Sequence, residues 1–286
     1  MRETFYASQS IYSEPGPYRE SLMRSDCEPE LVAQWIGSFM QHPRGTESKE
    51  QGFTPKQAAD LELRSVTEIL SVAVERNLLE NDAGTPKVGG VCRDFAILAA
   101  SRFRDRGTPA RLRVGFADYL VPDHWEDHWL CEWHDGERWK RLDVEFAAVG
   151  VTSFNALDVP RERFLTASEA WFRVRDEPEI ASRFGVSSLD LGGAWFVAGS
   201  LFREIAALRK LELKPWDYWG LSEKLSRVST EWSQQAWIAL DQLASCLRSA
   251  DVDREGEPET VSGWSLPKQV ISFPQSEPVT IVLRNS

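Results

Sequence analysis

The segment Gly-Gly-Val-Cys-Arg-Asp-Phe-Ala, residues 89–96, joins a break in the chain to the start of a helix. Two consecutive glycines allow a sharp turn and a close approach of a second backbone. After Cys92, apolar residues recur at the spacing of one helical face: Phe95, Ala96, Ala99 and Phe103. The sequence therefore predicts a helix that begins at Cys92 and ends at the breaker-rich residues 106–109.

Cys92 occupies a position that suits a nucleophile. A thiol attacks a carbonyl carbon as its thiolate, and a helix N-terminus and a nearby imidazole both lower the thiol pKa. N–H groups in the first helical turn, including that of Cys92, point toward the oxyanion that such an attack creates. We therefore predict that Cys92 is a catalytic nucleophile.

Two strands and a turn supply the other polar groups. Residues 129–133 and 138–144 read as strands on either side of the Asp-Gly pair at 135–136, a dipeptide favoured in two-residue hairpin turns. With this pair at the turn centre, the numbers of paired residues add to 271, so His128 faces Asp143. Directly opposed Cβ atoms lie about 4.5–5.5 Å apart, which lets a carboxylate accept a hydrogen bond from an imidazole. We predict His128 as the base and Asp143 as the group that orients it.

The elements around these residues predict an α+β fold. An irregular arm over residues 1–27 precedes a helical pattern over residues 29–40, and a second helical pattern runs from Thr54 to about residue 79. Residues 112–116 alternate between apolar and polar side chains, as expected for a half-buried strand. Helices followed by antiparallel strands are typical of the α+β class.

The chain is longer than one typical domain. We expect a catalytic domain over residues 1–150 and a mainly helical region over residues 151–286 that ends in two short strands. The helical patterns of this second region cover residues 161–171, 195–208 and 222–247, and its strands cover 270–273 and 279–283.

Composition narrows the classes of partner. The net charge of −11 argues against nucleic acid, whose phosphates need a surplus of Lys and Arg on one face. No apolar stretch approaches transmembrane length, and the first residues lack the pattern of a secretory signal, so we expect no membrane partner. We expect a cytoplasmic protein with reduced thiols, because its four cysteines lie far apart without a Cys-x-x-Cys pair.

The three other cysteines have a less catalytic setting. Cys131 and Cys246 read as small apolar residues of the core. Cys27 stands between Asp26 and Glu28, whose negative charge opposes thiolate formation.

Three short motifs resemble those of the transglutaminase-like superfamily. They are Gly-Val-Cys92-Arg-Asp-Phe-Ala, Asp127-His128-Trp129 and Trp139-Lys-Arg-Leu-Asp143, in the order and with the separations of that family. The resemblance covers roughly residues 89–146 and implies a papain-like core with a Cys-His-Asp triad. It also implies a second oxyanion donor upstream of the cysteine, which no residue here matches. The region after residue 150 looks similar to an extension of some bacterial members.

The reaction class stays open between two outcomes. The expected substrate carries an amide or thioester, and the acyl group passes either to an amine, as in a transamidase, or to water, as in an amidase or peptidase. No cofactor is expected, and no acidic loop of the EF-hand type points to calcium. The oligomeric state is undetermined by sequence.

Two other readings compete with catalysis. His124, His128 and His134 lie near Asp123 and Asp127, which raises a metal site, although their positions alternate poorly for one. A non-catalytic binding protein that keeps the fold would have an unreactive thiol.

Some residues near the motifs have simpler structural roles. Asp94 suits the first turn of a helix because a carboxylate is favoured by the helix dipole there. We expect core or cross-strand packing, more than an acyl-binding groove, from the strand tryptophans, which are Trp125, Trp129, Trp133 and Trp139.

Overall fold

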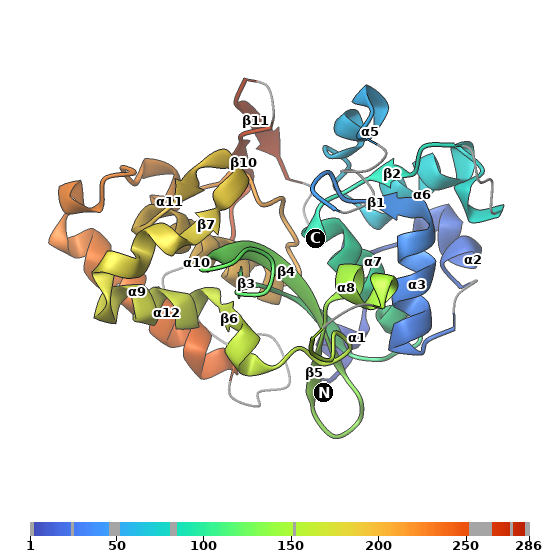
Figure 1. Cartoon of the computed structure of the whole chain (residues 1–286), viewed down its shortest axis with the longest axis horizontal. Coiled ribbons are helices and arrows are strands. Elements are labelled where there is room, and N and C mark those ends of the chain that lie inside the picture. The colour runs from blue at the N-terminus through green and yellow to red at the C-terminus, as the bar shows by residue number, and fades with distance from the viewer. Residues whose placement is uncertain are drawn as a thin grey trace. The chain divides into compact units, whose positions relative to one another are not determined.

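The computed structural model describes residues 3–23, 26–45, 52–80, 85–150, 153–251, 265–274 and 277–283 (Figure 1). These residues combine helices with antiparallel and parallel strands, so the chain has the α+β class that its sequence predicts. They group into two compact units, the first of residues 3–112 and 130–159 and the second of residues 113–129 and 160–286. That residues 1–150 form a catalytic domain stays a prediction.

The beginning of the chain is more ordered than the predicted irregular arm. It forms two short helices, α1 (Glu3–Ala7) and α2 (Arg19–Leu22). Tyr6 and Leu22 are buried in the first unit, so tertiary packing stabilises helices that are too short to show a sequence pattern.

The helical pattern after Thr54 belongs to two helices, α5 (Pro55–Asp60) and α6 (Val66–Glu75), and not to one. Ser65 explains the break. Its hydroxyl accepts the N–H of Glu68, and the Glu68 carboxylate accepts the N–H of Ser65, which is the capping box of a new helix start. The earlier helix, α3 (Pro29–Phe39), is confirmed.

Helix α7 (Cys92–Asp105) is the centre of the first unit. Every residue from Cys92 to Arg104 is buried, so the helix is covered on all sides and not on one face alone. It packs against α3, α6 and α8 (Val144–Val149) (Figure 1). Directly before it, β2 (Val88–Gly89) pairs in parallel with β1 (Met40–Gln41).

The hairpin register differs from the predicted one. Strand β4 (Trp125–His134) pairs with β5 (Trp139–Leu142) so that His134 faces Trp139, and the numbers of paired residues add to 273 and not 271. The connection has four residues because the Asp135 carboxylate accepts the N–H groups of Glu137 and Arg138 and so draws both into the loop. Asp143 therefore does not face His128 directly.

A sheet with the strand order β6-β3-β4-β7-β8 belongs largely to the second unit. β5 pairs with β4 outside this order, and the other strands of the sheet are β3 (Ala110–Ala117), β6 (Phe164–Thr166), β7 (Phe184–Val186) and β8 (Leu191–Gly192). The predicted helix over residues 161–171 is wrong in its first half. Thr166 ends β6 and caps α9 (Ala167–Asp176), since its hydroxyl accepts the N–H of Glu169.

Helices cover this second sheet. The buried helix α10 (Ala194–Leu208) is confirmed, and α9 packs against both α10 and α12 (Gln234–Asp251) (Figure 1). The single helix predicted over residues 222–247 is wrong. It divides into α11 (Leu221–Lys224) and α12, because the loop between them closes on itself through a 2.7 Å bond from Trp232 Nε1 to the Ser226 carbonyl.

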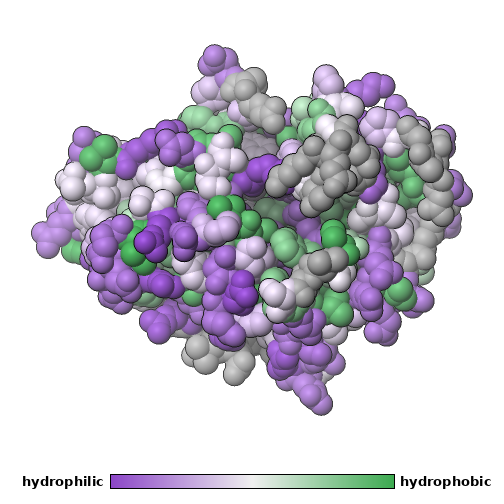
Figure 2. Space-filling view, in the orientation of Figure 1, coloured by the Kyte–Doolittle hydropathy of each residue, from purple (hydrophilic) through white to green (hydrophobic). Residues whose placement is uncertain are grey.

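The two predicted C-terminal strands are confirmed as β10 (Gln269–Ser272) and β11 (Val279–Val282). They form an antiparallel sheet with β9 (Asp217–Tyr218), in the order β11-β10-β9. Hydrophilic residues prevail on the face shown in Figure 2, with small apolar patches between them. None of the described helices combines the length and the apolar composition needed to cross a bilayer.

Candidate active site

Cys92 is the first residue of α7, as predicted, and only 6% of its surface is exposed. Asp94 has its predicted structural role in the first turn. One of its carboxylate oxygens accepts the Val91 N–H at 3.0 Å, and the other accepts Arg93 Nη1 at 3.0 Å. Because Arg93 compensates this carboxylate, the thiol next to it does not face an unbalanced negative charge.

The two glycines before Cys92 are required by close packing. A Cβ added to Gly89 would overlap the backbone carbonyl of Gln57, and one added to Gly90 would overlap the end of the Met40 side chain. Neither glycine has a positive φ. The close approach that these glycines allow is therefore to the chain's own α5 and β1.

Four residues that sequence reasoning missed hold this segment in place, directly or through one another. The Asp60 carboxylate accepts the Gly89 N–H at 3.0 Å and forms two bonds with Arg76. The Gln57 side chain donates to the side-chain oxygen of Gln41, and the backbone carbonyl of Gln41 accepts the Gly90 N–H. Asp60, Arg76 and Gln41 carry no recognisable motif, and only their long-range hydrogen bonds reveal them. Gln57 could have been found, because Thr54-x-x-Gln57 is the capping-box pattern of a helix start.

Asp143 follows the last residue of β5 and forms the N-cap of α8. Its Oδ1 accepts the Phe146 N–H at 3.2 Å, its own N–H donates to the Ala156 carbonyl, and its side chain is 1% exposed. Helices α7 and α8 pack against each other. The first unit therefore holds both Cys92 and Asp143 at the starts of two packed helices.

His128 lies in β4, in the part of that strand that belongs to the second unit, and is 4% exposed. Within this unit, the ring of Tyr119 meets the imidazole edge to face, with ring centroids 6.1 Å apart. Tyr119 is itself covered by the guanidinium of Arg163, which pairs with Asp118 at 2.6 Å. An aromatic neighbour held in this way limits the orientations open to the imidazole.

The histidines of the metal alternative have other partners. His124 Nε2 lies 3.4 Å from a carboxylate oxygen of Glu126, and His134 Nδ1 accepts the Gly136 N–H in the β4–β5 loop. Within the described ranges, no group of three or more His, Cys, Asp or Glu side chains is arranged to hold a metal ion.

Cys131 has the predicted role of a small core residue. It is fully buried in β4, and burial raises the pKa of its thiol far above the usual value, against the opposing effect of Arg104. Cys27 and Cys246 are partly exposed.

Two of the strand tryptophans pack differently. Trp125 stacks on Phe184 of the neighbouring strand β7, as expected, whereas Trp133 stacks on Phe103 of helix α7 and not on a neighbouring strand.

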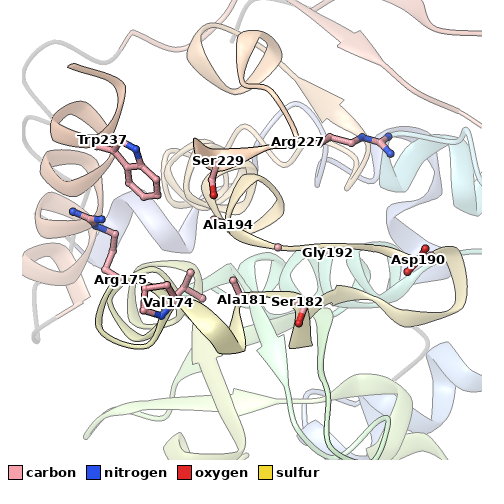
Figure 3. Close-up of a pocket in the computed structure, with 12 residues that line it drawn as sticks. Val174, Arg175, Ala181, Ser182, Asp190, Gly192, Ala194, Arg227, Ser229 and Trp237 are labelled. Carbon is pink, nitrogen blue, oxygen red and sulfur yellow. The ribbon is translucent and has the colours of Figure 1, made fainter. Parts of the chain in front are cut away.

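A pocket of about 310 Å³ lies within the second unit (Figure 3). Its two arginines lie toward opposite ends. Arg175 pairs with Asp241 through two bonds, and Arg227 covers the ring of Trp195. The side chain of Trp237 points into the space between. None of the predicted triad residues lines this pocket, so it supplies no group to the predicted chemistry.

No family model matches the chain, and no curated protein is similar to it. Among solved structures, the chain is similar to a candidate cysteine protease from Cytophaga hutchinsonii, at 18% identity and a TM-score of 0.36. The match covers 56% of this chain and 44% of that protein, so the chain spans less than half of that protein's length. A likeness at this level assigns neither a fold family nor a reaction, and function rests on this chain's own residues.

Proposed function

We propose that this chain is a cysteine-dependent acyl-transfer enzyme of the transglutaminase-like kind, with a papain-like core. Cys92 acts as nucleophile, His128 as base and Asp143 as the group that orients the base. The position of Cys92 at the first residue of α7 carries the proposal. All three residues fall within the predicted catalytic domain of residues 1–150.

The setting of Cys92 favours its thiolate. The positive end of the α7 dipole lies at the sulfur-bearing residue, and an anion is stabilised there. Burial opposes the thiolate, because a charge is poorly solvated in the protein interior. A base close to the sulfur would offset this cost, and His128 is the proposed base.

The sequence motifs around His128 and Asp143 support their pairing in a triad. Asp127-His128-Trp129 and Trp139-Lys-Arg-Leu-Asp143 resemble the His and Asp motifs of the transglutaminase-like superfamily, and they follow Cys92 in the order of that family. In that role the Asp143 carboxylate accepts a hydrogen bond from one imidazole nitrogen of His128, and the other nitrogen takes the Cys92 proton.

The proposed reaction passes through an acyl-enzyme. His128 takes the proton of the Cys92 thiol, and the thiolate attacks the carbonyl carbon of an amide or thioester and forms a C–S bond. The bond from that carbon to the amine nitrogen or thiol sulfur breaks, and the leaving group takes the proton from His128. Water or an amine then attacks the acyl-enzyme and gives its proton to His128 as the thiolate leaves. Attack by water makes the protein an amidase or peptidase, and attack by an amine makes it a transamidase.

Acyl-enzyme trapping tests this proposal. The protein is incubated with a small acyl thioester, and peptide mass spectrometry locates the added acyl group. We expect acylation of the peptide that contains Cys92, its loss in Cys92→Ala, and its retention in the matched variant Cys131→Ala. Equal acylation of Cys92→Ala would reject the proposed nucleophile.

A further inference from the structure

One buried carboxylate joins three elements of the first unit. Asp60 lies at the end of α5 and is 6% exposed. Its two oxygens each accept a bond of 2.7 Å from Arg76, the C-cap residue of α6, and Oδ2 also accepts the Gly89 N–H of β2 at 3.0 Å. Asp60 therefore ties α5 and α6 to the segment that leads into Cys92.

The N–H groups after Gly89 are held as well. The Gly90 N–H donates to the Gln41 carbonyl of β1 at 3.0 Å, and the Val91 N–H donates to the Asp94 carboxylate at 3.0 Å. Three successive peptide groups before Cys92 are thus bonded to three different elements. This arrangement fixes the direction in which the chain enters α7.

Packing alone does not require an ion pair at this place. Burying two charges is costly, and a pair of apolar side chains of similar size often stabilises a core as well or better. An apolar side chain in place of Asp60, however, could not accept the Gly89 backbone N–H, which Asp60 does. Gly89 has no room for a side chain, because the Gln57 carbonyl of α5 occupies that space.

We propose that Asp60, held by Arg76, is a positioning residue for Cys92, which anchors the Gly89 N–H and so sets the backbone that delivers the sulfur. This inference rests on the proposed role of Cys92 as nucleophile. Asp60 does not touch the reacting atoms. It acts through the three residues between its bond and the thiol.

The test uses the full chain and two substitutions of Asp60. Asp60→Asn keeps the size of the side chain but loses the charge that binds Arg76, and Asp60→Ala removes both bonds. Asp158→Asn is the matched control, because Asp158 also forms a two-bond pair with an arginine, Arg138, and has no bond to residues 89–92. The readouts are the rate of Cys92 alkylation by iodoacetamide as a function of pH and the hydrogen exchange of the Gly89 amide.

We expect the Asp60 variants to fold, to exchange the Gly89 amide faster, and to alkylate Cys92 about tenfold more slowly at pH 7, since small misplacements of a reacting group have effects of this size or larger. The pH midpoint of alkylation should move upward, which a loss of stability alone would not cause. Asp158→Asn should match the wild type. Absence of labelling at Cys131 confirms that each variant is folded.

Two results would overturn the inference, and only one of them would also reject Cys92 as the nucleophile. A folded Asp60→Asn with the wild-type rate and midpoint rejects the positioning role and leaves the proposed nucleophile intact. An ordinary thiol pKa for Cys92 in the wild type rejects both. If neither Asp60 variant folds, Arg76→Lys replaces them, because lysine keeps the positive charge but cannot form the two-bond pair. Arg76→Lys must then slow the alkylation of Cys92 and raise its pH midpoint, or the inference fails.

Discussion

Cys131 pairs with Leu142 in the β4–β5 ladder, and this pairing ends the strand one residue before Asp143. Asp143 lies just beyond the last pair of the ladder and caps α8, where its carboxylate accepts the Phe146 N–H. A carboxylate that begins one helix and belongs to the proposed triad has two roles, which substitutions can separate.

Asp143→Asn and Asp143→Ala make that separation. Asparagine is as good an N-cap as aspartate, so the free energy of unfolding of Asp143→Asn, measured in urea, should lie within a few tenths of a kcal/mol of the wild-type value. That of Asp143→Ala should be about 1 kcal/mol lower. Both should lose most acylation of Cys92, because an amide does not stabilise an imidazolium as a carboxylate does. Full acylation activity in Asp143→Asn would leave Asp143 with the capping role alone.

The two glycines before Cys92 should respond differently to alanine. A Cβ at Gly89 would meet the Gln57 backbone, which cannot move away without shifting α5, whereas a Cβ at Gly90 would meet the mobile end of the Met40 side chain. Overpacking lowers the free energy of unfolding by about 1–3 kcal/mol. We expect a loss at or above the upper end of this range for Gly89→Ala and a smaller loss for Gly90→Ala. Urea unfolding of both variants measures the difference, and the reverse order would contradict the packing of α5 on β2.

Local signals in the sequence predict the start of the site well. The glycine pair, the helical spacing after Cys92 and the helical pattern from Thr54 each depend on neighbouring residues, and the structure has a helix start at both places. The prediction of the β4–β5 register was wrong for a specific reason. Loop length there depends on which N–H groups the Asp135 carboxylate accepts, and an Asp-Gly pair is compatible with loops of two or four residues.

Long-range contacts lie outside what such signals can predict. Asp60 meets Gly89 across 29 positions of sequence and Arg76 across 16, so no local pattern marks it. The three-residue strand β6 and the two-residue strand β8 form because the sheet beside them accepts their backbone bonds, and their own sequences are too short to show alternation.

The buried thiol of Cys131 should make the protein less stable in alkali. Burial raises the pKa of this thiol in the folded state above its unfolded value of about 8.5, so the stability it contributes is complete below that pH and falls as the pH rises above it. Denaturation by urea at pH 7.5 and pH 10 should show a smaller alkaline loss in Cys131→Ala than in the wild type. An equal loss in both proteins would contradict this assignment.

Asp135 should contribute to stability at neutral pH and lose that contribution in acid. Hydrogen bonds from the Arg138 N–H and the Lys140 ammonium, together with the Glu137 N–H, hold the pKa of its carboxyl well below its usual range. The stabilisation is present above the unfolded pKa of about 3.9 and is lost as the pH falls through the folded value. The stability difference between the wild type and Asp135→Asn should therefore shrink between pH 5 and pH 2, and a constant difference would exclude the charge as its source.

The pH dependence of Cys92 alkylation in the wild type and in His128→Ala tests the proposed thiolate–imidazole pair most directly. Iodoacetamide is added across a pH series, and mass spectrometry quantifies labelling of the Cys92 peptide, with the buried Cys131 as an internal control. We predict that wild-type Cys92 reacts well below the unperturbed thiol pKa of about 8.5 and that His128→Ala abolishes this reactivity. If Cys92 titrates as an ordinary or buried thiol in both proteins, the proposal of a cysteine-dependent enzyme is contradicted. A binding protein with an inert cysteine is then favoured.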